Sequence, residues 1–177
     1  MKLKLVFFIV IASIIHAMTN TVLAKSDAIS QIEVDIKNTK NEVIGKATIK
    51  PNADKVDIHL VASGLTPGVH AFHIHEFGKC ETPEFKSAGG HFNPTNNEHG
   101  FNNPKGFHGG DLPNLEVGQD GTVDVIVTTH AVSLKKDQPH SLLKSDGTSL
   151  IIHEKADDYV TDPAGNAGAR IACGVIK

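Results

Sequence analysis

Two histidines stand two residues apart in the segment AFHIHEFGKC, residues 71–80. If this segment is a β-strand, His73 and His75 point to the same face, ~6.6–7 Å apart along the backbone. Two imidazoles placed in this way can bind one metal ion at about 2 Å each. Phe72 and Ile74 then face the opposite side, toward a core. A His-x-His pair alone is weak support for a metal site, because chance and core histidines produce the same spacing.

The segment GGHFNPTNNEHGFNNPKGFHGGDL, residues 89–112, supplies further side chains that bind metals. It contains His91, His99, His108 and Asp111. Three imidazoles and one carboxylate suit tetrahedral zinc, and the neighbouring glycines allow the backbone to fold closely around an ion. His153, at the end of the apolar run SLII, is a further candidate.

His91, His99 and His108 belong to a segment, residues 78–118, that has no hydrophobic periodicity and holds half of the sixteen glycines and half of the eight prolines. A structureless loop of this length is uncommon in a compact domain. One interpretation is disorder, and the other is a loop ordered by metal and a disulfide. The only cysteines are Cys80 and Cys173. A bond between them would close a loop of about 90 residues, worth ~4–5 kcal/mol in the chain-entropy model; two buried free thiols are the alternative.

The elements that must position these side chains are short strands. Apolar residues alternate with polar ones in IEVDIKN, KVDIHLVAS and GTVDVIVTTHAV, and TSLIIHEK and ARIACGVI are shorter apolar runs. The turn sequences PNADK, GLTPG, GQDG and KSDG separate them, and no long stretch has a helical period. Period-two runs at this spacing predict an antiparallel sandwich or barrel.

The first 24 residues have the pattern of a secretory signal. Lys2 and Lys4 precede an apolar run over residues 5–15, and small residues at 22–24 provide a cleavage site. The run is shorter than the ~20 residues of a spanning helix, although an uncleaved anchor is the alternative. A lipoprotein is not expected, because no cysteine lies near the cleavage site. We therefore predict a signal peptide at 1–24 and one domain at 25–177, exported to a periplasm or the extracellular space, where a disulfide can persist.

Charge argues against two classes of partner. The formal net charge of −3 becomes −5 when the two lysines of the signal are removed. A mildly acidic chain is not expected to bind nucleic acid, or a membrane once the signal has been removed.

Five motifs resemble those of the copper/zinc superoxide dismutases: GVHAFHIHEFGKC, GGHFNP, HGGDL, HEKADD and GNAGARIACGVI. They occur in the family's order over residues 68–176, and the strand pattern from residue 31 extends the likeness over nearly all of the mature chain. The resemblance implies an all-β, antiparallel Greek-key β-barrel or sandwich (immunoglobulin-like) with a long metal-binding loop. It also implies one copper and one zinc ion per subunit, superoxide as the substrate, and either a homodimer or a monomer.

The resemblance assigns the metal ligands by position. The implied copper ligands are His73, His75, His91 and His153, and the implied zinc ligands are His91, His99, His108 and Asp111. His91 then bridges the two ions as an imidazolate. The implied reaction converts two superoxide anions to oxygen and hydrogen peroxide at a redox-active copper, with His91 and Arg170 as catalytic residues.

Other matched positions support the ligands. Asp157 matches a carboxylate that bonds one copper histidine and one zinc histidine, and Arg170 matches an arginine that attracts and positions the anion. Cys80 and Cys173 match an intramolecular disulfide, whereas His70 matches a structural histidine that binds no metal.

The chain departs from the family pattern at two places. Ala71 replaces a usual glycine, which changes packing but not chemistry. The segment between His153 and Arg170 is shorter than in animal members, where it carries charges that steer superoxide, so steering in this chain needs its own explanation. Lys105 and Lys155 lie in matched segments and could assist Arg170. Four further histidines match no ligand, and three of these (His59, His130 and His140) are predicted to lie on the surface; the fourth, His16, leaves with the signal.

Three other functions compete with dismutation. A non-catalytic copper or zinc carrier with the same fold is expected to lack a copper ligand or the arginine, and this chain has both. A zinc hydrolase is disfavoured because no His-Glu-x-x-His motif is present and Glu154 is not placed like a metalloprotease base. A secreted binding module with incidental histidines would not have the complete set of seven matched ligands.

Overall fold

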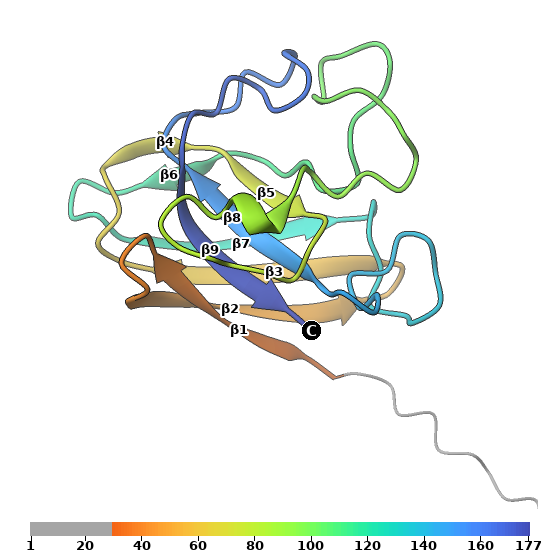
Figure 1. Cartoon of the computed structure of the whole chain (residues 1–177), viewed down its shortest axis with the longest axis horizontal. Helices are drawn as coiled ribbons and strands as arrows, with labels where there is room; N and C mark the ends of the chain where they lie inside the picture. Colours follow the sequence, from red (N-terminus) through yellow and green to blue (C-terminus); the bar gives the residue numbers. More distant parts are fainter. Residues whose placement is uncertain (1–29) are drawn as a thin grey trace, which may run out of the picture.

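The computed structural model describes residues 30–177, which form an all-β fold (Figure 1). The strands are β1 (Ile32–Asn38), β2 (Val43–Asn52), β3 (Lys55–Ala62), β4 (Gly68–His70), β5 (Phe72–His75), β6 (Leu115–Val117), β7 (Val123–Thr129), β8 (Thr148–His153) and β9 (Arg170–Ile176). Within the described part of the chain the only helix is a single 3₁₀ turn, η1 (Lys86–Ala88). The predicted all-β class is confirmed. The predicted signal peptide lies outside the described residues.

The strands form where apolar and polar residues alternate, because alternate side chains reach opposite faces of a sheet. Val34 and Ile36 of β1 are buried, as are the four alternating apolar residues of β3. The sequence reading did not identify β2. Its signal is weak because only Ala47 and Ile49 are buried in ten residues, although both alternate with polar neighbours ahead of the PNADK turn.

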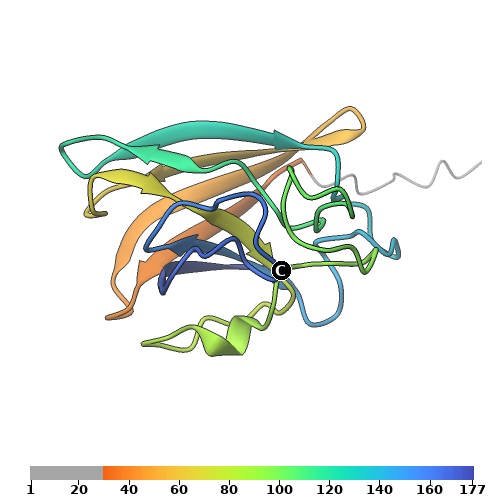
Figure 2. The ribbon, with the colours of Figure 1, turned by 90° about the horizontal axis from the view of Figure 1, so that it is seen from above.

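The main sheet is antiparallel and curls on itself (Figures 1 and 2). Its strand order is β5-β8-β9-β1-β2-β3-β7, and β4 and β6 form a separate pair. Only Ala71 separates β4 from β5, and β6 packs beside β7. The β4–β6 pair therefore connects the two edge strands, β5 and β7, and closes the curled sheet around one hydrophobic core. Ala71 is fully buried, donates its backbone N–H to Lys155 O and accepts from His153 N.

Two long loops lie over one side of this sheet. In Figure 1 the segment 90–112 (green) and the segment 154–169 (blue) both extend beyond the strands on the same side. The first loop runs from β5 to β6 and the second joins β8 to β9, so both loops leave from neighbouring strands of the main sheet, β5 and β8. Within the described residues no helix is long and apolar enough to cross a membrane.

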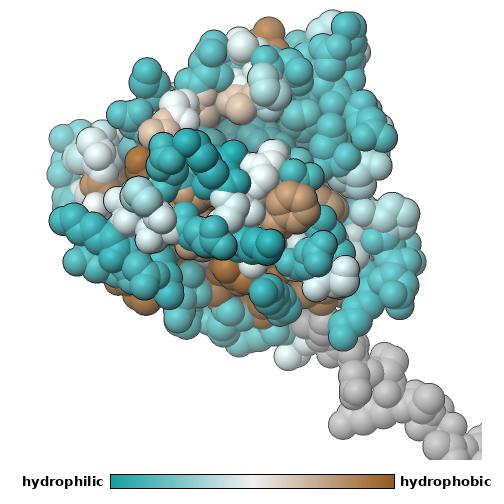
Figure 3. Space-filling model, in the orientation of Figure 1, coloured by the Kyte–Doolittle hydropathy of each residue, from teal (hydrophilic) through white to brown (hydrophobic). Residues whose placement is uncertain are grey.

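The surface seen in Figure 3 is mainly hydrophilic, with small hydrophobic areas. The most exposed large hydrophobic side chains are distributed over several elements: Val43 of β2, Val61 of β3, Val69 of β4, Ile126 of β7 and Val160 of the second loop. Whether the chain forms a homodimer stays a prediction of the family resemblance.

Cys80 and Cys173 form the disulfide that the resemblance implied. Cys173 lies in β9, and Cys80 lies near the start of the first loop, 93 residues earlier. Phe85 and Ala88 are buried against the disulfide together with Ile151 of β8. The disulfide therefore fixes the beginning of the metal-binding loop to the sheet.

We expect removal of this disulfide to lower the melting temperature by roughly 10 °C, because a 93-residue loop is worth ~4–5 kcal/mol in the chain-entropy model. Metal content should fall at the same time, since the released segment carries a backbone contact of His75. Calorimetry and metal analysis of the Cys80→Ser/Cys173→Ser double variant, with reduced wild type beside it, measure both effects. An unchanged melting temperature would show that the bond adds no stability.

Candidate metal centre

The metal-binding loop is fastened to β5 by backbone contacts. Ile74 N donates to Gly110 O at 2.8 Å, and Phe92 N donates to Ile74 O at 2.8 Å. Isolated bridges pair His73 with Asp111 and His75 with His91. A Cβ atom at Gly110 would collide with Ile74 O, so this close approach requires glycine. The loop thus brings its own histidines beside those of the strand.

β5 presents its side chains as the alternation predicted. Phe72 and Ile74 belong to the hydrophobic core, while His73 and His75 are buried on the other face. β8 pairs with β5 through Phe72 and Ile152, which places His153, the last residue of β8, at the same site. The four predicted copper ligands, His73, His75, His91 and His153, form one buried group whose ligand atoms lie within 4.8 Å of one another.

Each of these four rings has one nitrogen with a partner and one without. Two of the partners are carboxylates: His73 Nε2 lies 2.8 Å from Asp157 Oδ2, and His91 Nδ1 lies 2.9 Å from Asp111 Oδ1. His75 Nδ1 lies 3.0 Å from Gly89 O, and His153 Nδ1 lies 3.4 Å from Gly168 O.

The nitrogens left over are His73 Nδ1, His75 Nε2, His91 Nε2 and His153 Nε2, and all are buried without a hydrogen-bond partner. The only other such side-chain atom within residues 30–177 is the Ser149 hydroxyl. Buried polar atoms are normally paired. Four orphaned imidazole nitrogens in one group therefore fit a metal ion that accepts nitrogen ligands.

The predicted zinc ligands form a second group around one carboxylate oxygen. Nδ1 atoms of three rings approach Asp111 Oδ1: His91 at 2.9 Å, His99 at 3.0 Å and His108 at 3.3 Å. The other oxygen, Oδ2, accepts the backbone N–H groups of His108 and Gly100, each at 3.0 Å. Three ring nitrogens and a carboxylate that is itself held by backbone donors fit the coordination that zinc prefers.

The two groups are linked twice. His91 belongs to both, with Nε2 in the first group and Nδ1 in the second. Asp157 also connects them, because its Oδ2 meets His73 Nε2 at 2.8 Å and its Oδ1 meets His99 Nε2 at 2.9 Å. Asp157, which the family resemblance assigns to a place between one histidine of each group, thus contacts one ring of each group.

Burial and hydrogen bonds set the protonation of the site. Burial lowers the pKa of His91 to about 4 and that of His153 to about 3, despite the opposing hydrogen bonds to Asp111 and Gly168 O. Burial also holds the pKa of His75 well below its usual value. Neutral rings keep a lone pair for a metal. Burial raises the pKa of Asp157, but hydrogen bonds with His73 and His99 outweigh it and hold that pKa below its ordinary range.

His99 differs from its neighbours. Burial would lower its pKa, but hydrogen bonds to the carboxylates of Asp111 and Asp157 raise the pKa to about 9. In the metal-free protein the His99 ring is therefore protonated at pH 7, and a metal that takes its Nδ1 must displace a proton.

We expect the zinc affinity of metal-free protein to rise with pH between 7 and 9, by up to about tenfold per unit while one proton is released. The sign follows because protonated His99 cannot bind a metal and loses its proton only as pH approaches 9. His91 and His153 add no slope in this range, since both are already neutral. Competition titrations with a chromophoric chelator measure the slope; an affinity that is flat from pH 7 to 9 would contradict this protonation state.

Arg170 lies beside the group of predicted copper ligands and donates hydrogen bonds to the beginning of the metal-binding loop, which the disulfide also anchors. It pairs with His153 in the β8–β9 ladder, and its guanidinium donates to Phe85 O at 2.7 Å and to Gly89 O at 2.6 Å. Gly89 O is also the partner of His75 Nδ1. The guanidinium has five N–H groups, so three remain for an anion.

The two lysines suggested to assist Arg170 have different surroundings. Lys105 Nζ pairs with Glu98 at 2.7 Å, which offsets its charge. Lys155 has no ion pair within the described residues, and its side chain lies against Gly168, whose carbonyl contacts His153. Of the two lysines, Lys155 is therefore the one whose charge no ion pair offsets within the described residues, although the Glu154 carboxylate also approaches Gly168.

The remaining histidines of residues 30–177 lie outside both groups. His70 is buried with both ring nitrogens 2.7 Å from backbone carbonyls, those of His153 and Thr66, so no ring nitrogen is left for a metal. His59 is on the outer face of β3, 2.7 Å from Asp124. His130 and His140 are exposed.

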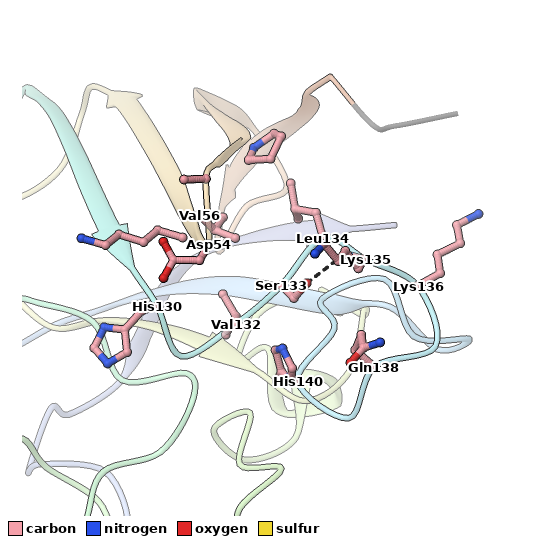
Figure 4. Close-up of a pocket in the computed structure, with 13 residues that line it drawn as sticks. Asp54, Val56, His130, Val132, Ser133, Leu134, Lys135, Lys136, Gln138 and His140 are labelled. Atoms are coloured by element: carbon pink, nitrogen blue, oxygen red, sulfur yellow. Dashed lines mark hydrogen bonds between the residues drawn. The ribbon is translucent and has the colours of Figure 1, made fainter. Parts of the chain in front are cut away.

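His130 and His140 line a cavity of about 860 Å³ between the β2–β3 turn and the loop that follows β7 (Figure 4). Their rings are well separated in this view, with Val132 between them, and Lys136 extends away from the other labelled residues. Among the described residues, neither histidine belongs to a group of metal-binding side chains. The cavity is separate from the metal centre.

Two residues that support the site were not identified from the sequence. Asn114 Nδ2 donates to Asp157 O at 3.0 Å and its Oδ1 accepts from Asp157 N at 2.9 Å. The Tyr159 hydroxyl accepts the Asn114 backbone N–H at 2.7 Å. Asn114 is three residues after Asp111 and Tyr159 two residues after Asp157, and this closeness to two matched residues was the available signal.

The fold and the site define a class: an all-β barrel protein with a histidine-rich centre for two adjacent metal ions. Comparison with known proteins identifies the family within this class. The family model for copper/zinc superoxide dismutase (SODC) matches residues 43–176, and the chain belongs to this family of oxidoreductases that use copper and zinc.

Several relatives cover most of the chain. "Superoxide dismutase [Cu-Zn] 1" of Aquifex aeolicus is 54% identical over 81% of this chain and 85% of its own length. The "Superoxide dismutase-like protein YojM" of Bacillus subtilis is also 54% identical, over 81% of this chain and 74% of its own length.

Solved structures of proteins with related names are also similar to this chain. A superoxide dismutase-like protein from Bacillus subtilis, as a double variant in which a tyrosine and a proline are replaced by histidine, matches with a TM-score of 0.80 and 54% identity over 81% of this chain and 95% of that one. The Cu/Zn superoxide dismutase of Brucella abortus matches with a TM-score of 0.68 and 31% identity, over 84% of this chain and all of that one.

Proposed function

We propose that this protein is an exported superoxide dismutase that converts two superoxide anions and two protons to oxygen and hydrogen peroxide. The observation that carries the proposal is that two groups of metal-binding side chains share His91. One group offers four unpartnered ring nitrogens, and the other offers three Nδ1 atoms around Asp111 Oδ1. This donor set supports one copper and one zinc ion per subunit, with the His91 imidazolate between them.

Copper, when bound, supplies the one-electron redox chemistry of the reaction, and zinc fixes the far side of the shared ring. The side chains do the remaining work. His91 Nε2 faces the copper group and is the atom at which a proton can be held and released beside the substrate. Asp157 orients the rings of His73 and His99, and the free N–H groups of Arg170 bind the anion. Lys155 supports attraction of the anion in place of the longer charged loop.

The proposal is tested by metal analysis and a superoxide assay on protein that begins at Lys25. We expect one copper and one zinc per chain and dismutation of superoxide. His75→Ala separates the two metal groups, because His75 belongs only to the copper group. This variant should lose copper and activity and keep zinc. A wild type that binds both metals without dismutating superoxide would favour the alternative, a non-catalytic copper/zinc carrier.

Export and final location are part of the proposal and rest on residues 1–24. Mass spectrometry of the protein recovered outside the cytoplasm should give an N-terminus at Lys25. Recovery of the full-length chain in the cytoplasm alone would contradict export while leaving the metal centre untouched.

A further inference from the structure

Asp157 links the two metal groups, but its own position depends on a loop segment without regular secondary structure. Residues 154–169 join β8 to β9. A carboxylate on such a segment can bridge His73 and His99 only if the backbone around it is fixed. Metal-binding rings depend on the partners of their second nitrogen for orientation. Whatever fixes Asp157 therefore also affects how the rings are presented to a metal.

Tyr159 contacts Asp157 and the metal-binding loop from one position. Its backbone N donates to Asp157 Oδ1 at 2.7 Å, the same oxygen that meets His99 Nε2. Its phenol oxygen accepts from Asn114 N at 2.7 Å, and Asn114 holds the backbone N–H and C=O of Asp157 through its side-chain amide. Tyr159 thus reaches Asp157 directly and through Asn114.

The carbonyl group and the ring of Tyr159 also contact the metal-binding loop. Its carbonyl accepts from Asn102 N at 3.0 Å, and its ring lies 5.6 Å, centroid to centroid, from that of Phe101. That carbonyl also packs closely over Gly100, whose N–H donates to Asp111 Oδ2. Contacts to the zinc group and to Asp157 therefore meet around one residue, through the backbone and the side chain of Tyr159.

The backbone of Tyr159 is in a conformation that its type rarely adopts. Its φ is +60°, in the left-handed region that is unusual for a bulky aromatic residue. Such a conformation costs free energy and persists only where surrounding contacts enforce it. Here the enforcing contacts are those to Asn114, Asn102 and Phe101, and the result is that the Tyr159 N–H points at the Asp157 carboxylate.

We propose that Tyr159 is a positioning residue of the metal centre, whose hydroxyl, through Asn114, holds the Asp157 carboxylate in place to orient His73 and His99. This inference rests on the proposed function in assigning copper to the group of His73 and zinc to the group of His99. Tyr159 acts on metal affinity and needs no contact with either ion.

The test is Tyr159→Phe, which removes only the hydroxyl and keeps the ring. We expect the zinc and copper affinities of metal-free protein, measured by competition with a chelator, to fall about 3- to 10-fold, the effect of one lost hydrogen bond. Thr148→Val is the matched control, because it also removes one hydrogen bond of a hydroxyl group, in this case a buried one to Leu142 O at 3.0 Å, away from the centre. It should stay within about twofold of wild type.

A second measurement separates positioning from general stability. In the Asp157→Asn background, Tyr159→Phe should cause no further loss of affinity, because the carboxylate on which Tyr159 acts is already gone. A loss of equal size in both backgrounds, or a Tyr159→Phe variant that binds both metals like wild type, would overturn the inference. A wild type that binds both metals but does not dismutate superoxide would overturn the proposed function alone, since every readout here is binding.

Discussion

Replacing Arg170 by glutamate is expected to lower the rate constant for superoxide, expressed per bound copper ion, about 10- to 10³-fold. The mature chain has a formal net charge of −5 once Lys2 and Lys4 of the predicted signal are removed from the total of −3. Its overall field therefore repels an anion, and a local positive charge must offset that field near His153. Arg170 is next to His153 in the ladder and has free N–H groups.

The dependence of the rate on salt identifies the cause. In wild type, added salt should slow the reaction because it screens an attraction; in Arg170→Glu the dependence should weaken or reverse, because salt then screens a repulsion. Lys50→Glu makes the same change in net charge at an exposed position of β2 and should have a small effect. Arg170→Gln should fall between wild type and Arg170→Glu. Equal rates and equal salt slopes in wild type and Arg170→Glu would remove Arg170 from the mechanism.

Replacing Asp157 by asparagine is expected to weaken copper and zinc binding about 10- to 100-fold, although Asp157 is proposed to contact neither ion. The two carboxylate oxygens each accept from a histidine ring, one from His73 and one from His99. Asparagine offers a single acceptor oxygen and presents an NH₂ group to the other ring. One ring must then turn or change its protonated nitrogen, which takes a lone pair away from a metal.

Asp158→Asn provides the matched control, because it removes a carboxylate one residue away. Asp158 is exposed and bonds the Thr161 hydroxyl and Asn166 in its own turn, with no histidine contact. Chelator competition on metal-free protein should show a large loss for Asp157→Asn and little change for Asp158→Asn. Wild-type affinities and activity in Asp157→Asn would refute the role assigned to this carboxylate.

Local patterns in the sequence were sufficient for much of the fold. Alternation in residues 32–38 and 55–62 predicts β1 and β3 because burial of one sheet face selects every second residue. The same rule places His73 and His75 on one face and Phe72 and Ile74 in the core. β2 was not predicted, because most of its side chains are at least partly exposed. Where one face carries little burial, the alternating signal is weak.

The candidate ligands were also identified from the sequence, His73 and His75 by their spacing and the others by residue type, but their assignment to two metal ions came from a family resemblance. His99 and His108 lie in a loop without periodicity, and no local rule states that their Nδ1 atoms meet at one oxygen of Asp111. The pairing of Cys80 with Cys173 likewise joins positions 93 residues apart.

Only the tertiary structure decided which ring nitrogen of each histidine is available to bind a metal ion. It leaves Nδ1 of His73 but Nε2 of His75 without a partner, because Asp157 engages one ring and Gly89 O the other. It turns Arg170 toward the carbonyls of the disulfide-linked loop and brings Tyr159 against Asn114. The physical reason is that these choices depend on hydrogen bonds between residues about 14 to 85 positions apart, which form only when the sheet has closed and both loops lie on the same side of it.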